Sequence, residues 1–337
     1  MKEALLYHTK ESDEVECCLC NHYCHIPQGQ KGICGVRVNQ RGKLFALNYG
    51  NIVAANIDPI EKKPLFHFLP GTLSYSIACV GCNFKCDFCQ NWEISQVAEA
   101  QSLGARTSAS SPIAVIEQAR VHECPSISYT YTEPTIYFEF AYDCAKIAAA
   151  KGIYNVFVTN GFMSTQALTD IAPYLDAANV DIKSFRDDFY QKICKGRLAP
   201  VLDTIKRMRE LDIWVEATTL VIPGMNDSEQ ELAEIASFLV SVDKNIPWHV
   251  SAFHPDYRLT ERVHISADVL EKAYHIGKEK GLSFVYRGNM PTATGENTYC
   301  PGCGKLIVER KGFFVEKKKM NASACGYCGH GIEGVWE

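Results

Sequence analysis

The cysteines constrain this chain more than any other feature of its sequence. There are 16 cysteines among 337 residues, and most of them fall into three short clusters. The first is Cys17-x-x-Cys20-x-x-x-Cys24 with Cys34 downstream, the second is Cys82-x-x-x-Cys86-x-x-Cys89, and the third is Cys300-x-x-Cys303 followed by Cys325-x-x-Cys328. In a reducing compartment, thiols at such short spacing indicate metal sites rather than disulfides.

Charge and hydropathy exclude several classes of protein. Lys and Arg number 34 and Asp and Glu number 39, which gives a formal net charge of −5. This balance argues against a general nucleic-acid coat or a polybasic membrane binder. The longest apolar stretches, such as 214–223, have the length of a strand, and none approaches the ~20 residues of a membrane span. The start, Met1-Lys2-Glu3-Ala4, lacks the apolar core of a signal peptide, so we expect a cytoplasmic protein.

Strands alternate with helices between the second and third clusters. The expected strands cover 73–78, 126–131, 154–159, 179–184, 213–222, 248–253 and 282–287, and the expected helices cover 135–151, 164–175, 187–211, 228–242 and 267–280. This alternation predicts an α/β fold with a parallel sheet and crossover helices. Six or seven units are fewer than the eight of a closed barrel, which favours an open or partial barrel with its chemistry at the carboxyl ends of the strands.

The second cluster offers only three thiolates. Four-iron clusters usually take four, one for each iron, so Cys82, Cys86 and Cys89 would leave one iron open for chemistry. The alternative is a zinc site or a complete four-cysteine cluster with Cys79 as the fourth ligand. Cys79, however, ends an expected strand before the loop begins. The spacing therefore predicts a three-cysteine [4Fe-4S] site with a catalytic role.

The loop from Cys82 to Cys89 resembles the signature of radical S-adenosylmethionine (SAM) enzymes, including the aromatic residue before the last cysteine. The segments that extend this resemblance are 57–65, 67–71, 89–92, 129–135, 159–161, 218–227 and 253–257. They are similar to the pyruvate formate-lyase activating enzyme-related branch and, over almost the whole chain, to the AmmeMemoRadiSam-system radical SAM protein. The resemblance implies a partial (β/α)6-type barrel in which SAM chelates the open iron. An electron from the cluster then cleaves SAM to methionine and a 5′-deoxyadenosyl radical.

The resemblance also implies further residues that bind SAM. Phe88, by its position, should pack near the adenine. Thr132 and Glu133 stand where the superfamily often has Gly-Gly-Glu-Pro, with both glycines replaced, so a contact there would use backbone carbonyls. Asp181 and Lys183 alternate on an expected strand and would share one face, which suits the ammonium and carboxylate of methionine. The alternative for this pair is an ion pair at the barrel rim.

Three polar residues at or within expected strands allow two interpretations each. His254 follows a strand and could approach SAM, or it could be a satisfied structural histidine. Asn160 could bind the ligand or only shape the Asn-Gly turn. Glu216 interrupts an apolar strand, which favours a buried and paired carboxylate over a substrate contact.

The terminal clusters predict two further metal sites. Cys300, Cys303, Cys325 and Cys328 form paired knuckles around an expected hairpin at 306–315, which favours a zinc ribbon over a rubredoxin-like iron site. For Cys17, Cys20, Cys24 and Cys34, structural zinc and a second iron–sulfur cluster both remain open, and His22 or His25 could replace one thiolate. We therefore expect a Cys-rich N-terminal module at 1–48, a radical SAM partial barrel at 49–293 and a zinc-ribbon-like module at 294–337.

The function expected from these features is that of a radical SAM enzyme. Its 5′-deoxyadenosyl radical would abstract hydrogen from an unidentified protein or small molecule, and its partners would be SAM, an electron donor and a substrate. The family name adds Memo-like or AMMECR-like proteins as candidate partners, and we expect no nucleic acid and no membrane. One alternative is an activase of a glycyl-radical enzyme. A more distant one is a non-catalytic metal-binding adaptor, which would predict zinc throughout and a basic surface.

Overall fold

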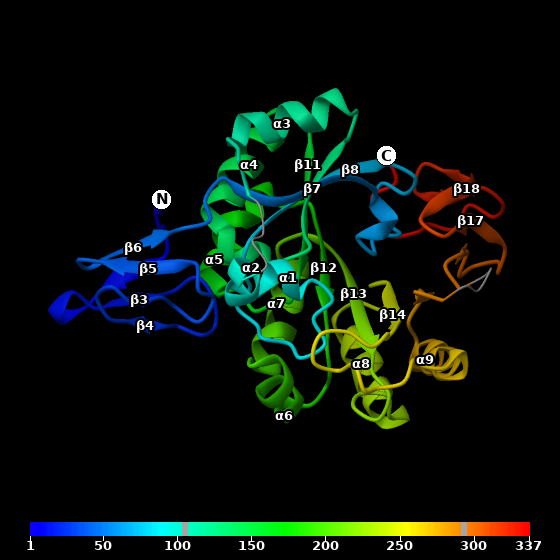
Figure 1. Ribbon diagram of the computed structural model, residues 1–337. Helices are drawn as coiled ribbons and strands as arrows, with labels where there is room; N and C mark the ends of the chain where they lie inside the picture. Colours follow the sequence, from blue (N-terminus) through cyan, green and yellow to red (C-terminus); the bar gives the residue numbers. More distant parts are fainter. Residues whose placement is uncertain (103–106, 291–294) are drawn as a thin grey trace.

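Strands from the middle of the chain form one large sheet in this computed structural model, which describes residues 1–102, 107–290 and 295–337 (Figure 1). Its order within the described residues is β15-β14-β13-β12-β11-β10-β8-β7-β9. The bounds are β7 Asn51–Pro59, β8 Leu73–Cys79, β9 Ser108–Ala109, β10 Ser126–Tyr129, β11 Tyr154–Thr159, β12 Ala177–Asp181, β13 Trp214–Val221, β14 Trp248–Ala252 and β15 Val285–Gly288. Neighbours from β8 to β15 are parallel, while β7 is antiparallel to both β8 and β9. The predicted α/β class with a parallel sheet is confirmed, and the sheet is open in the described part of the chain.

Helices connect the parallel strands. The α-helices are α1 Trp92–Ser95, α2 Val97–Ser102, α3 Pro112–Val121, α4 Phe138–Ala150, α5 Thr165–Ile171, α6 Asp187–Phe189, α7 Leu198–Glu210, α8 Glu229–Val242 and α9 Ala267–Lys280. Short turns of other helix types are η1 Glu11–Asp13, η2 Ile60–Lys62, η3 Pro134–Tyr137, η4 Ala172–Tyr174 and the π-helical η5 Tyr190–Cys194. Ser111, Ser164 and Ser228 cap α3, α5 and α8 by accepting a backbone N–H three residues on. No helix among the described residues is long and apolar enough to cross a membrane.

Two element boundaries differ from the sequence prediction near the site. The strand expected at 179–184 ends at Asp181, so Lys183 lies beyond it rather than on its face. The helix expected at 187–211 is divided into α6, η5 and α7. Lys195 there has a left-handed φ of 62°, and a Cβ on Gly196 would lie 2.3 Å from the ring of Phe84. The helix breaks because the chain at Gly196 must pass close to the loop that carries the cysteines.

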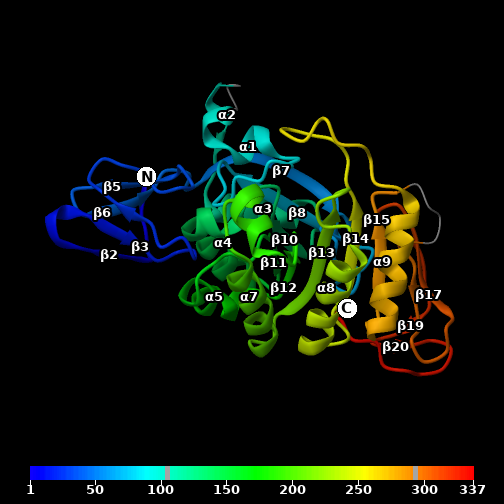
Figure 2. The same cartoon turned by 90° about the horizontal axis from the view of Figure 1, so that it is seen from below.

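Small sheets lie at opposite ends of the large one, as Figures 1 and 2 both show. The N-terminal sheets have the orders β1-β6-β5 and β2-β3-β4, with bounds β1 Lys2–Glu3, β2 Tyr7–Thr9, β3 Val15–Cys17, β4 His25–Ile26, β5 Arg37–Gln40 and β6 Lys43–Ala46. The C-terminal elements are β16 Thr298–Tyr299, β17 Leu306–Lys311, β18 Phe314–Lys318, β19 Met320–Asn321 and β20 Ala324–Cys325. The expected hairpin is β17–β18. The expected boundary at 48/49 falls between β6 and β7, and the one at 293/294 lies outside the described residues.

A buried polar network joins the large sheet to the C-terminal sheets. Glu216 of β13 is fully buried and pairs with His249, with 2.7 Å between Oε2 and Nε2. Its carboxylate also accepts the backbone N–H of Phe66 and of His67. The imidazole of His67 in turn contacts the hydroxyl of Tyr286 at 2.6 Å and the carbonyl of Glu333 at 2.9 Å. Glu216 is therefore the buried, paired carboxylate that the sequence favours.

Candidate active site

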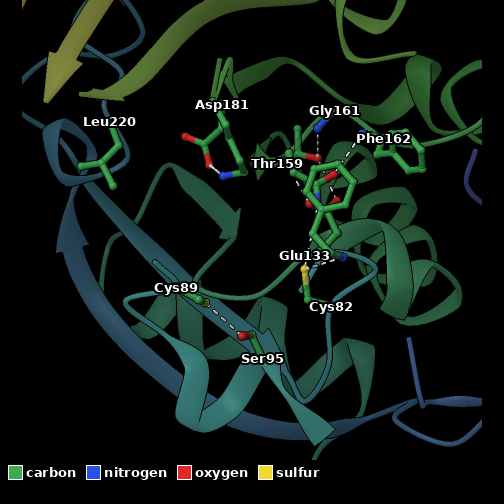
Figure 3. Close-up of polar contacts among 12 residues, drawn as sticks. Cys82, Cys89, Ser95, Glu133, Thr159, Gly161, Phe162, Asp181 and Leu220 are labelled. Carbon is green, nitrogen blue, oxygen red and sulfur yellow. Dashed lines mark hydrogen bonds and ion pairs between the residues drawn. The ribbon is translucent and has the colours of Figure 1, made fainter. Parts of the chain in front are cut away.

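The loop after β8 carries Cys82, Cys86 and Cys89 beyond the carboxyl end of that strand. Figure 3 shows Cys82 and Cys89 of this loop. Two backbone hydrogen bonds hold this loop against η5, from Lys85 N to the carbonyl of Cys194 at 2.9 Å and from Asp87 N to the carbonyl of Ile193 at 3.2 Å. Gly81 enters the loop with a φ of +112°, and a Cβ there would lie 3.0 Å from a methyl carbon of Val36. The loop is thus fixed from both sides by segments distant in sequence.

Each thiol in the loop has a hydrogen-bond partner. The backbone N–H of Phe84 donates to the sulfur of Cys82 at 3.3 Å, and the hydroxyl of Ser95 lies 3.1 Å from the sulfur of Cys89 (Figure 3). The thiol of Cys194 forms a hydrogen bond with Cys86, which together with burial raises the pKa of Cys86 well above its ordinary value. Burial raises the pKa of Cys82 in the same way.

These thiols suit an iron–sulfur cluster. Iron cations would deprotonate them, and the surrounding donors are the kind that stabilise thiolate and sulfide sulfur. Cys79 is fully buried at the end of β8, and its electrostatic neighbours are Tyr137 and Cys144 of η3 and α4. The structure therefore places Cys79 against a helix.

Glu133 ties two strand ends together. Its carboxylate accepts the hydroxyls of Thr135 at 2.5 Å and Thr159 at 2.8 Å, and the backbone N–H of Asn160 at 2.8 Å (Figure 3). Burial raises its pKa, against the effect of these donors. Thr132 next to it donates its hydroxyl to the carbonyl of Cys79 at 2.7 Å. Both side chains thus position the ends of β8, β10 and β11 beside the cysteine loop, and any ligand contact here would come from the backbone.

Asn160 reaches the cysteine loop directly. Its Nδ2 donates to the side-chain oxygen of Asn83 at 2.8 Å and lies 3.8 Å from the sulfur of Cys82. Its own Oδ1 accepts the backbone N–H of Phe162 at 3.0 Å. One end of the Asn160 amide therefore shapes the turn and the other contacts the cysteine loop, while ligand binding by Asn160 stays a prediction.

Asp181 and Lys183 form an ion pair of 2.8 Å at the end of β12. Burial opposes the charge of Lys183, but Asp181 and the neighbouring Cys86 raise its pKa well above its ordinary value. The ammonium also lies 5.8 Å from the ring centroid of Phe88, which is buried next to Cys89. The rim ion pair is thus observed, and it stands beside the cysteines.

His254 is the exposed member of the predicted set. Its Nε2 lies 2.9 Å from the side-chain amide of Gln90, the residue after Cys89. The loop after β14 also packs against the residues that follow Cys89, because the rings of Tyr257 and Trp92 stack with centroids 5.2 Å apart. The structure therefore gathers all the predicted cofactor residues around one loop. Ser95 and Cys194 were missed, because their contacts with the cysteines arise only from packing.

Comparison with known proteins identifies the family to which this site belongs. The radical SAM superfamily matches residues 76–239. An uncharacterized protein of Methanocaldococcus jannaschii is 43% identical over 99% of this chain and 99% of its own length. The chain belongs to the radical SAM superfamily. Membership implies a [4Fe-4S] cluster and SAM, which the three thiols of the loop after β8 fit, with Cys86 buried and Cys82 and Cys89 half-buried.

Two more distant similarities concern an activating enzyme and a solved structure. The isethionate sulfite-lyase activating enzyme of Desulfovibrio desulfuricans is 24% identical over 60% of this chain and 66% of its own length. The crystal structure of Streptococcus suis SuiB bound to S-adenosylmethionine superimposes with a TM-score of 0.50 at 15% identity, covering 66% of this chain and 52% of that one. The second similarity concerns the fold alone.

The C-terminal cysteines of this radical SAM protein form a compact group. The sulfurs of Cys300, Cys303, Cys325 and Cys328 all lie within 4.8 Å of one another, and among the described residues no other group of three or more potential ligands does so. Two of the separations are 3.7 and 3.8 Å. Four thiolates about 2.3 Å from one zinc ion would be about 3.8 Å apart, so this group has the dimensions of a single-ion site.

The N-terminal cysteines are neighbours with a wider spacing. Cys17, Cys20 and Cys34 are buried, Cys24 is half-buried, and burial raises the pKa of Cys17 and Cys20. The four thiols interact electrostatically with one another but do not reach the spacing of the C-terminal group. The Nε2 of His22 is engaged by the carbonyl of Asn83 at 2.8 Å, and exposed His25 lies 3.7 Å from Glu14. Both imidazoles therefore have partners other than the cysteines.

Proposed function

We propose that this protein reductively cleaves SAM at a [4Fe-4S] cluster held by Cys82, Cys86 and Cys89, and uses the resulting radical to abstract hydrogen from a substrate. The observation that carries the proposal is the set of three partnered thiols in one loop at the carboxyl edge of the sheet. The burial of Cys79 beside Tyr137 supports three ligands rather than four. The protein would work in the cytoplasm with a separate electron donor.

The residues around the loop would bind and orient SAM. When bound, the cluster supplies the electron that cleaves SAM to methionine and a 5′-deoxyadenosyl radical. The paired charges of Asp181 and Lys183 would hold the amino-acid part, Phe88 would pack near the adenine, and His254 would close the exposed side. Glu133 would keep Asn160 and the neighbouring backbone in place, and the bulk of the strand ends would exclude water from the radical.

The test is the formation of 5′-deoxyadenosine by anaerobically reconstituted protein given SAM and dithionite. Wild-type protein should form it, whereas Cys82→Ala, Cys86→Ala and Cys89→Ala should each lose the product. Cys79→Ala is the matched control, because it removes a buried thiol at the end of the strand that leads into the loop, and it should retain both cluster and product. Loss of the cluster in Cys79→Ala would refute the three-ligand site.

A second candidate function is the activation of a glycyl-radical enzyme, favoured by the similarity to the Desulfovibrio desulfuricans activating enzyme. It would place the radical on a backbone glycine of a partner protein. Electron paramagnetic resonance would detect such a radical on the partner after turnover. The resemblance to the AmmeMemoRadiSam-system protein would favour instead a substrate linked to Memo-like or AMMECR-like proteins, and incubation with each class of partner would separate the two.

The C-terminal cysteines have a structural role in this proposal. The C-terminal group would bind structural zinc, since its thiols have single-ion spacing and Cys325 has its pKa lowered to about 7, where N–H donors and the Cys300 thiol outweigh burial. A non-catalytic adaptor with zinc throughout would need single-ion spacing in every cysteine group, and only the C-terminal group of the described residues has it.

A further inference from the structure

The N-terminal cysteines lie directly against the loop of the central site. The turn at Cys20 is attached to the segment after β11 by two backbone contacts. Cys20 forms an isolated β-bridge with Met163, and the backbone N–H of Asn21 donates to the carbonyl of Phe162 at 3.0 Å. His22 then contacts the carbonyl of Asn83, the residue after Cys82, at 2.8 Å. One hydrogen bond and two short stretches of chain, from Cys20 to His22 and from Asn83 to Cys82, therefore connect the two cysteine sets.

A buried cation faces the N-terminal thiols. Arg37 is 1% exposed and pairs with Glu139, with 2.5 Å between Nη2 and Oε2. Its Nε and Nη1 are buried and have no hydrogen-bond partner in the described structure. Burial opposes its charge, but Glu139 and the nearby Cys17 and Cys34 keep its pKa raised. Glu139 pairs with one end of this guanidinium, and the two unsatisfied donors leave the rest of it able to interact with an anionic thiolate centre nearby.

The spacing of the thiols distinguishes between metal centres. The sulfurs of the C-terminal group are as close together as a single zinc ion would hold them. Among the described residues, neither the N-terminal cysteines nor the central triad form such a group. Thiolates on a four-iron cluster sit on different irons and so are farther apart than thiolates on one ion. The N-terminal set therefore matches the central iron–sulfur ligands rather than the zinc-like group.

We propose that Cys17, Cys20, Cys24 and Cys34 hold a second iron–sulfur cluster near the buried Arg37, and that this cluster passes electrons to the central cluster. One electron from a low-potential donor, such as a reduced flavodoxin or ferredoxin, reduces the second cluster. That cluster is reoxidised as the central cluster takes the electron up, and no bond or proton is involved. The electron-transfer step rests on the proposed function of the central site, while the presence of the second cluster does not.

The first experiment measures metal in the full-length Cys82→Ala/Cys86→Ala/Cys89→Ala variant after anaerobic reconstitution. We expect about four irons, about four sulfides and about one zinc per chain, with a paramagnetic signal on reduction. An iron-free variant with about two zincs would overturn the proposal. If this variant does not fold, the wild-type protein decides, with about eight irons expected against about four. A protein with both clusters that forms no 5′-deoxyadenosine would refute the proposed function and leave the second cluster standing.

The second experiment follows the electron. His22→Phe keeps an aromatic ring but removes the hydrogen bond to Asn83, and the exposed His25→Phe is its matched control. After rapid mixing with reduced flavodoxin and freeze-quenching, we expect the second cluster in His22→Phe to reduce at the wild-type rate and the central cluster to reduce several-fold more slowly. Wild-type reduction rates of both clusters in His22→Phe would overturn the transfer step.

Discussion

At the scale of single residues, the site depends on donors that touch the cysteine sulfurs. Cys194 forms a hydrogen bond with Cys86, and its thiol would be the donor once Cys86 is a thiolate ligand of the cluster. Hydrogen bonds to cluster sulfurs raise the reduction potential because they stabilise the more negative reduced state. Cys194→Ala should therefore lower the potential of the central cluster and slow SAM cleavage, with iron content unchanged. The measurement is a redox titration monitored by electron paramagnetic resonance.

The control for Cys194 is Cys144→Ala, which removes an equally buried thiol from α4, away from the loop. This control should leave the potential as it is in the wild-type protein. Equal potentials in Cys194→Ala and Cys144→Ala would show that the thiol of Cys194 only fills space.

A second residue-scale prediction concerns acid stability. Burial lowers the pKa of His67 to about 4, whereas an unfolded histidine titrates near ~6.5. Between these values the unfolded chain binds more protons, so the free energy of unfolding falls as the pH falls. His67 should contribute a loss of about 2 kcal/mol between pH 7 and pH 5. Urea denaturation at both values should show this loss in the wild-type protein and a smaller one in His67→Gln; an equal loss in both would assign the acid sensitivity elsewhere.

At the scale of elements, η5 and the turn after it hold the cysteine loop in place. A methyl group on Gly196 would lie 2.3 Å from the ring of Phe84, so Gly196→Ala must displace the turn or the loop. Such overpacking costs about 1–3 kcal/mol. Gly196→Ala should lower thermal stability and shorten the lifetime of the central cluster, followed by its absorbance in air-free buffer.

The control for Gly196 is Gly331→Ala, because a Cβ there meets nothing within 4 Å and its φ is not left-handed. It should match the wild-type protein in both measurements. A cluster in Gly196→Ala that is as long-lived as in this control would show that the loop does not need the support of η5.

At the scale of the whole molecule, the C-terminal sheets are attached through buried contacts rather than a separate core. Cys300, Cys325 and Trp336 pack with Phe66 and Tyr286 in one small cluster. Removing the proposed zinc by Cys303→Ser should therefore loosen the residues after 295 and expose His67 to solvent, and it should lower the apparent melting temperature by several degrees. Zinc analysis, limited proteolysis and calorimetry would test this, and protease resistance in a zinc-free variant would argue against a structural metal.

The α/β alternation, the three cysteine sets and the loop that carries the central one could be predicted from the sequence, because strand period, helix length and ligand spacing are properties of neighbouring residues. The contacts that those residues make follow only from the folded chain. In the fold, Cys194 forms a hydrogen bond with Cys86, and Arg37 lies within electrostatic range of Cys17 and Cys34. Glu133 accepts the backbone N–H of Asn160 and so connects the ends of two strands. The helix expected at 187–211 is broken where Gly196 passes Phe84. These pairs are far apart along the chain, so their distances follow from packing of the whole fold and leave no local pattern.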